Sequence, residues 1–417
     1  MSSNPYLVII ISILAGNYIF RTTIEFLNAF SLKPDLPSEF KGYYDETKYK
    51  KSQQYLQENT YFKLAHSTVS TIIILCFILF GFFNFIDQLL RGFVSGEIIL
   101  GLLFGGAIFL IFQLIDIPFS LYQTFVLEEK YGFNRTTAKT FILDLLKSWL
   151  LTFIIGGIVF SVVIWFFLKF QTTAWIWCWL AMTVFQLFLT FIAPVWIMPL
   201  FNKFIPLESG ELKESIETYA KDHAFKLKGI FTMDGSKRSS KSNAFFTGFG
   251  KYRRIVFFDT LIKKHTVGEL VSVLAHEMGH YKKKHILKHI VISILTTGLL
   301  FFILSFFINN PNLFAAFRMD NLSVYGSLFF FGFLYTPINL ILSIFLTILS
   351  RKHEYEADEY AVTTYKHSQD FIEALKKLTV DNLSNLTPHP LKVFIDYTHP
   401  PVLKRIEAIR ALNPNSV

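Results

Sequence analysis

The sequence predicts a mainly α-helical, polytopic membrane protein with a smaller domain outside the bilayer. Hydrophobic residues make up 52% of the 417 residues, charged residues only 17%, and the mean hydropathy is +0.42. A soluble domain carries about a quarter charged residues, so much of this chain must lie in lipid. Its apolar residues fall in seven runs, each long enough to cross ~30 Å of hydrocarbon. These runs are 6–29, 67–87, 97–125, 148–170, 174–200, 286–308 and 325–349.

Basic residues assign the two sides of the membrane. Arg21 lies within the first span, three basic residues (Arg91, Lys169 and Arg318) lie in short loops, and the rest lie on the opposite side. The positive-inside rule makes that opposite side cytosolic. The amino terminus is then outside or lumenal, and no basic stretch precedes Arg21, so the first span is expected to be retained. Topology also explains the net charge of +9, and no basic-aromatic motif indicates a nucleic-acid partner.

Four segments follow from this pattern. Residues 1–201 carry spans one to five, residues 202–285 form a long loop, residues 286–349 carry spans six and seven, and residues 350–417 form a cytosolic helical tail. Within the long loop, Phe, Ile and Val runs punctuated by Gly predict short strands. The expected elements are a helix at 210–226, strands at 229–233, 242–248 and 253–259, and a helix from 267 to 280.

The last of these helices carries a metal-binding pattern. Residues 276–280 read His-Glu-Met-Gly-His. Positions i and i+4 share a helix face, so His276 and His280 can direct their imidazoles to one ion. Glu277 lies beside the same space and is the candidate general base for an activated water. The plainer alternative is a solvated helix face that happens to carry two histidines.

A third ligand is required, because catalytic zinc usually takes three protein ligands and one water. Glu354 and Asp358 follow the seventh span and are again i and i+4. Glu354 can bind the ion while Asp358 accepts the free ring N–H of a zinc-bound histidine. A surface helix with i,i+4 charges is the alternative interpretation.

Other polar residues near these motifs are expected to have no part in the chemistry. Glu356 and Glu359 fall on other helix faces and are expected to be solvated. His285 and His289 continue the His276 helix, too far along it to reach the same metal, and are interpreted as structural or interfacial. Polar residues within the spans would line a hydrated space or join helices. They are Asn17, Arg21, Gln113, Asp116, Gln186 and Asn339.

Taken in order, the motifs resemble those of the Ste24-type CAAX prenyl proteases, integral-membrane zinc metalloproteases of the M48 family. The resemblance covers nearly the whole chain. It rests on Glu128–Asn134, Ser239–Phe246, His276–His280, Ser350–Arg351 with Glu354–Asp358, and His399–Pro401 with Arg405. It implies seven helices that enclose a chamber, and a cytosolic gluzincin-like zinc protease domain with a small β-sheet.

The resemblance also implies roles for individual residues. One zinc ion per chain would be bound by the three metal ligands His276, His280 and Glu354, with Glu277 as the base and Asp358 as the orienting group. The stretch Asn243-Ala244-Phe245 would be an exposed strand that binds the substrate backbone by strand addition. His399 and Arg405 would close the site and hydrogen-bond the scissile carbonyl as charge develops.

The implied substrate is a prenylated CAAX protein or peptide, which would lose its last three residues. The site would face the cytosol, in the endoplasmic reticulum membrane of a eukaryote or the plasma membrane of a bacterium. Two alternatives stay open at this point. One is a broad-specificity quality-control metalloprotease without a lipid requirement. The other is a non-catalytic scaffold or transporter with a structural zinc, although such zinc sites prefer four closed ligands, often Cys, and neither Cys76 nor Cys178 is near the motif.

Overall fold

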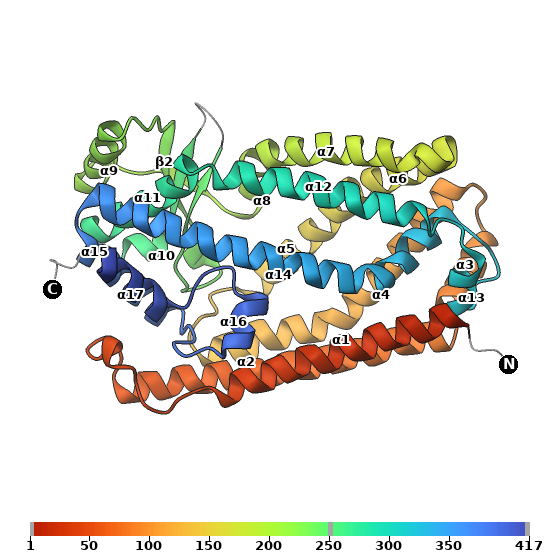
Figure 1. Ribbon diagram of the computed structural model, residues 1–417, viewed down its shortest axis with the longest axis horizontal. Coiled ribbons are helices and arrows are strands. Elements are labelled where there is room, and N and C mark those ends of the chain that lie inside the picture. Colours follow the sequence, from red (N-terminus) through yellow and green to blue (C-terminus); the bar gives the residue numbers. More distant parts are fainter. Residues whose placement is uncertain (1–3, 249–252, 413–417) are drawn as a thin grey trace.

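The computed structural model describes residues 4–248 and 253–412; the last five residues of the expected tail lie outside these ranges. Long helices form the body of the molecule and run roughly along its long axis (Figure 1). The seven predicted spans correspond to α1 (Pro5–Phe30), α2 (Glu46–Leu79), α4 (Glu97–Tyr122), α6 (Gly157–Phe170), α7 (Ala174–Ile192), α12 (His285–Ser305) and α14 (Val324–Tyr365).

Two of these spans, α6 and α7, belong to one continuous run of helical residues that folds back on itself. Six helical stretches in the described residues are long and apolar enough to cross a membrane, and one of them, Ala138–Phe201, has 64 residues. The chain reverses inside it at Gln171, whose φ is 47°. The sulfur of Cys178 on α7 then lies 4.0 Å from the carbonyl of Val163 on α6, so the two helices form an antiparallel hairpin. This stretch therefore supplies two crossings.

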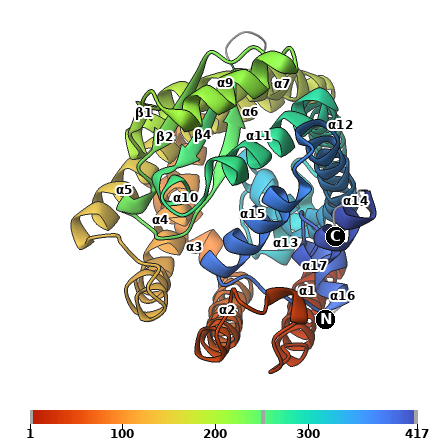
Figure 2. The ribbon, with the colours of Figure 1, turned by 90° about the vertical axis from the view of Figure 1, so that its left-hand side faces the viewer.

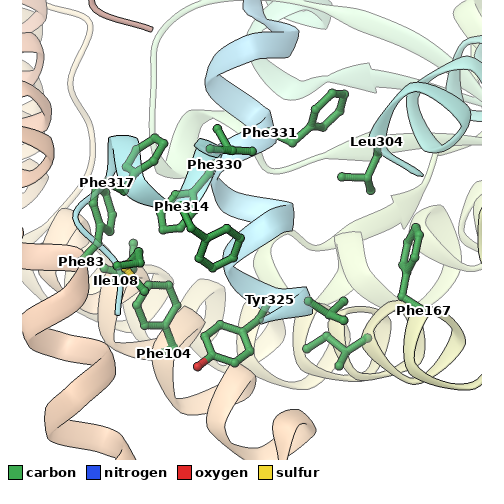
Figure 3. Close-up of a cluster of buried hydrophobic side chains, with 14 of the residues drawn as sticks. Phe83, Phe104, Ile108, Phe167, Leu304, Phe314, Phe317, Tyr325, Phe330 and Phe331 are labelled. Carbon is green, nitrogen blue, oxygen red and sulfur yellow. The ribbon is translucent and has the colours of Figure 1, made fainter. Parts of the chain in front are cut away.

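Short helices complete the membrane part and the tail. They are α3 (Phe82–Arg91), α5 (Ala138–Leu151), α8 (Met198–Phe201) and α13 (Pro311–Ala316), followed in the tail by α15 (Ser368–Asp381), α16 (Pro390–Asp396) and α17 (Val402–Leu412). At the end occupied by α3 and α13, aromatic side chains from several helices, among them α3, α4, α13 and α14, form a buried cluster (Figure 3). In that cluster Phe317 stacks on Phe330 with ring centroids 3.9 Å apart.

The opposite end of the molecule holds a mixed four-stranded sheet with the order β1-β2-β4-β3. β2 (Gly229–Met233) is parallel to β4 (Arg254–Phe258), while β1 (Phe204–Pro206) and β3 (Ala244–Thr247) pair antiparallel with β2 and β4 respectively. The three expected strands are present. β1 was not predicted, because three residues ending in proline give no alternating pattern. β3 is an edge strand, with one side free of strand partners in the described residues.

Helices cover this sheet and join it to the tail. α9 (Glu211–Asp222), α10 (Asp259–Ile262) and α11 (Val267–Lys282) come from the same loop as the sheet. Their apolar faces share one buried core with β4, α15 and α17, and Figure 2 shows these elements gathered around α11. Thr266 caps α11 in a capping box with Glu269, which fixes where the helix starts and therefore where its histidines point.

Candidate active site

The close approach of two helices builds the site. α11 packs against the part of α14 that extends beyond the membrane span, and Gly279 is the point of contact. A Cβ atom at Gly279 would lie 2.9 Å from Ala357 Cα and 3.0 Å from the Ala357 carbonyl oxygen. The two backbones therefore touch, and a glycine is required in the fourth position of the His-Glu-Met-Gly-His pattern.

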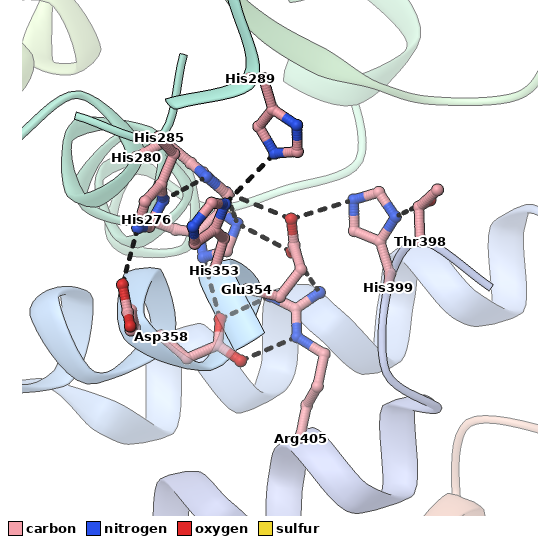
Figure 4. Close-up of polar contacts among 11 residues, drawn as sticks. His276, His280, His285, His289, His353, Glu354, Asp358, Thr398, His399 and Arg405 are labelled. Carbon is pink, nitrogen blue, oxygen red and sulfur yellow. Dashed lines mark hydrogen bonds and ion pairs between the residues drawn. The ribbon is translucent and has the colours of Figure 1, made fainter. Parts of the chain in front are cut away.

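This contact brings the three expected ligand residues together (Figure 4). His276 Nε2 lies 3.4 Å from Glu354 Oε2, and His280 Nε2 lies 3.2 Å from Glu354 Oε1. The two Nε2 atoms are 3.2 Å apart. Ligand atoms around a tetrahedral zinc ion, with bonds of roughly 2.0–2.1 Å, are separated by about 3.3–3.4 Å. The spacing therefore fits a zinc ion at the centre of the three residues.

Electrostatics also favour a cation here. Glu354 is 4% exposed, and its Oε2 accepts no hydrogen bond from the described residues. Burial favours the neutral form of His276, but its contacts with Asp358 and Glu354 outweigh this and raise the pKa of His276 to about 9. Without a metal the site therefore takes up a proton, and a bound metal ion would supply that positive charge instead.

Asp358 orients the first histidine. Its Oδ1 lies 2.9 Å from His276 Nδ1, which leaves His276 Nε2 facing the centre of the site. Arg405 on α17 donates from Nε and Nη2 to the two oxygens of Asp358, at 2.8 and 2.6 Å. Asp358 and Arg405 are both buried, so this bidentate pair also fastens the tail to the catalytic helix.

This geometry differs from what was expected of Arg405. The resemblance placed its guanidinium on the scissile carbonyl, but two of its nitrogens are occupied by Asp358. The remaining Nη1 lies 3.8 Å from Glu354 Oε2. Unlike Arg405, His399 has a side chain that is open to solvent at the site. Its Nε2 lies 3.4 Å from Glu354 Oε1, and the side chain is 63% exposed. Its Nδ1 is 3.0 Å from the hydroxyl of Thr398.

Arg351, which sequence reasoning noted only as part of a motif, fixes the segment that carries His399. Its Nη1 donates to the carbonyls of Val393 and Tyr397, at 2.8 and 2.7 Å. These two carbonyls lie at the end of α16, where the Val393 carbonyl also accepts the backbone N–H of Tyr397 at 3.3 Å. The tail therefore presents His399 from a loop that is anchored to α14.

Glu277 lies beside the ligands at the wall of a cavity of about 540 Å³. Burial raises the pKa of Glu277, while the charges of His276 and His280 act in the opposite direction. The cavity is lined by Gln186 from α7, Phe245 and Phe246 from β3, and His399 from the tail, as well as by Glu277 and His280. It therefore joins the membrane helices, the edge strand and the ligand helix in one space.

The edge strand offers backbone groups to this side of the molecule. Phe258 N–H donates to the Asn243 carbonyl at 3.0 Å, and Ala244 pairs with Phe257. Peptide groups alternate along an antiparallel pair, so those of Ala244 and Phe246 face away from β4. The Ala244 N–H is held by Asn243 Oδ1 at 2.8 Å, and an added strand that uses this N–H must displace that side chain.

Known proteins resemble this chain over nearly its whole length. Residues 27–203 match the family model described as CAAX prenyl protease N-terminal, five membrane helices, and residues 206–413 match the model of peptidase family M48. A CAAX prenyl protease 1 homolog of Arabidopsis thaliana is 34% identical over 418 residues and covers 97% of each chain.

The chain belongs to peptidase family M48.

Other relatives agree with this assignment. CAAX prenyl protease 1 of Saccharomyces cerevisiae is 39% identical over 312 residues, which cover 71% of this chain and 69% of that protein. The crystal structure of S. mikatae Ste24p superposes with a TM-score of 0.92 at 33% identity, covering 97% of this chain and 99% of that one. The protein is therefore a membrane-spanning metalloprotease, and the fold predicted from the sequence is confirmed.

Two residues of this M48 chain lie in surroundings that differ from those expected from the sequence. His285 was expected on a continuation of the His276 helix, but α11 ends at Lys282 and α12 begins at His285. Its Nδ1 lies 3.0 Å from His280 Nδ1. Glu356 was expected to be solvated, yet its Oε2 lies 2.9 Å from His285 Nε2. Helix periodicity alone could not reveal either contact, because each depends on where a second helix lies.

Proposed function

We propose that this protein is a zinc endopeptidase that removes the last three residues of prenylated CAAX proteins or peptides. The observation that carries the proposal is the convergence of His276, His280 and Glu354, within 3.4 Å of one another, beside Glu277 and an open strand edge. The relatives named CAAX prenyl protease 1 support the substrate class.

In this proposal His276, His280 and Glu354 would hold one zinc ion per chain, which would supply a water molecule of lowered pKa and a Lewis acid for the scissile carbonyl. Glu277 accepts the proton of the attacking water and returns it to the leaving amine. His399 hydrogen-bonds the carbonyl oxygen as negative charge develops on it. The bidentate pair of Asp358 and Arg405 keeps His276 in the ligating orientation, so Arg405 acts through Asp358 rather than on the substrate.

Substrate binding follows from the edge strand. An extended peptide added beside β3 gains main-chain hydrogen bonds from Ala244 and Phe246, which require little sequence specificity. Asn243 acts as a removable partner for the Ala244 N–H, and Phe245 contributes to the apolar wall of the cavity. The lipid of a prenylated substrate would partition into the bilayer around the spans while the peptide lies at the metal.

Residues 202–285 and 350–417 together form the catalytic domain in this proposal, and the membrane spans 1–201 and 286–349 carry it. The catalytic domain faces the cytosol, because nearly all basic residues lie on its side of the membrane. In a eukaryotic cell this orientation suits the endoplasmic reticulum membrane, and in a bacterial cell the plasma membrane.

The test is cleavage of matched farnesylated and unfarnesylated CAAX peptides by the purified protein, with zinc content measured in parallel. Glu277→Gln serves as the catalytic control and Glu359→Gln, on an exposed face of α14, as the matched neutral change. We expect cleavage three residues from the end, faster with the lipid, in wild type and Glu359→Gln only. Equal cleavage of both peptides would replace the substrate class with that of a general quality-control endopeptidase. Bound zinc without any cleavage would favour a scaffold.

A further inference from the structure

The two ligand histidines have different supports. His276 is oriented by Asp358, as described above. For His280, a histidine takes the place that Asp358 has beside His276, since His280 Nδ1 lies 3.0 Å from His285 Nδ1. On its far side, His285 Nε2 lies 2.9 Å from Glu356 Oε2. Three side chains from three helices therefore form one line that leads from the metal centre to a carboxylate. Figure 4 shows the two histidines of this line.

The interruption between helices α11 and α12 creates this line. Lys284 has a φ of 59° and a ψ of 32°, the left-handed conformation that non-glycine residues rarely adopt. The break ends α11 and starts α12 at His285, so the His285 ring turns back toward His280 instead of following the α11 face. His353 then stacks on His285, with ring centroids 3.9 Å apart and the planes 10° from parallel.

Proton positions along the line follow from the ligand atom of His280. A neutral imidazole that binds a metal through Nε2 carries its proton on Nδ1. The His280 Nδ1–H then donates to His285 Nδ1, which must be unprotonated. The single proton of neutral His285 is therefore on Nε2, where it donates to Glu356. Every nitrogen in the line has one matched function, and the carboxylate ends it.

We propose that His285 and Glu356 are positioning residues that hold His280 in the tautomer and orientation needed for metal binding. Ion-pair contacts hold Glu356 in turn, with Lys352 Nζ 3.8 Å and Lys288 Nζ 4.0 Å from its oxygens. The inference rests on the zinc site of the proposed function, and it adds to that site two residues that do not touch the ion.

A second metal site is the competing explanation for the same side chains. His285, His353 and Glu356 form the other group among the described residues whose donor atoms lie within 4.8 Å of one another. Metal on His285 Nε2 would move its proton to Nδ1, where it would meet the Nδ1–H of zinc-bound His280. In addition, the lone pairs of two parallel stacked rings point along their planes and do not converge on one ion. The arrangement therefore favours a hydrogen-bonded line.

Zinc affinity of the full-length protein in detergent tests the proposal, measured by competition with a chromophoric chelator. Positioning residues around metal-bound histidines change affinity by about 10–100-fold. We expect that loss in His285→Ala and in Glu356→Ala, and a smaller loss in Glu356→Gln, whose amide oxygen still accepts the His285 N–H. Glu359→Gln, on the same helix, should match wild type. Each variant's melting temperature separates misfolding from loss of affinity.

A double variant gives the sharpest outcome. Because the residues act in series, His285→Ala combined with Glu356→Ala should bind zinc no more weakly than His285→Ala alone. Additive losses would overturn the line, as would wild-type affinity in both single variants. Two zinc ions per chain, reduced to one by His285→Ala, would replace it with the second metal site. Absence of zinc binding by the wild type would instead reject the proposed function itself.

Discussion

Replacing Gly279 with alanine tests how closely the two ligand helices must approach. The added Cβ would lie 2.9 Å from Ala357 Cα, whereas ordinary van der Waals contact begins at 3.4–4 Å. The obstructing atoms are backbone and cannot rotate away, so α11 and α14 must separate by about 0.5–1.1 Å. Ligand distances in a metal site tolerate only about 0.2 Å. The shift thus separates His276 and His280 from Glu354 by more than the site allows.

We expect Gly279→Ala to lower zinc affinity by at least about tenfold and kcat/KM by about 100-fold, since a displacement of about 1 Å can have that effect on catalysis. The overpacking itself should cost roughly 1–3 kcal/mol of stability. Gly332→Ala is the control, because it lies on α14 with no atom within 4 Å of its new Cβ. Chelator competition and peptide cleavage measure the first two effects. Zinc affinity and activity within threefold of wild type would refute the close approach as the origin of the site.

Three further predictions follow from the described contacts. Glu277→Gln should retain zinc and lose about 10²–10⁴-fold in kcat, measured by peptide cleavage together with metal analysis, and simultaneous loss of zinc would make Glu277 a ligand. The pKa of about 9 at His276 means that zinc must displace a proton at neutral pH, so apparent zinc affinity should fall about tenfold from about pH 8 to about pH 7. A zinc affinity that does not change between pH 7 and pH 8 would contradict this proton displacement. Glu39→Ala removes the partner of Arg410 and of buried Lys376 and should cost about 1–3 kcal/mol, seen as a lower melting temperature than in Glu46→Ala, an exposed control.

The membrane spans and the metal ligands could be predicted from the sequence because both depend on local periodicity. Hydropathy located each membrane helix, and the i,i+4 spacing placed His276 with His280 and Glu354 with Asp358. The features that the sequence could not predict depend on contacts between helices. Arg405 donates to Asp358 across the boundary of the tail. His285 reaches His280 only because Lys284 adopts a left-handed conformation. Lysine rarely adopts this conformation, so its presence in the sequence does not predict it.

The chain order of the ligands has a consequence for biosynthesis. His276 and His280 precede the two membrane crossings made by α12 and the first part of α14, whereas Glu354 lies on α14 beyond its crossing and Arg405 comes later still. A ribosome therefore completes both crossings before the third ligand exists, and nearly the whole chain before the Asp358–Arg405 pair can close. The unfinished protein is a protease without an assembled centre.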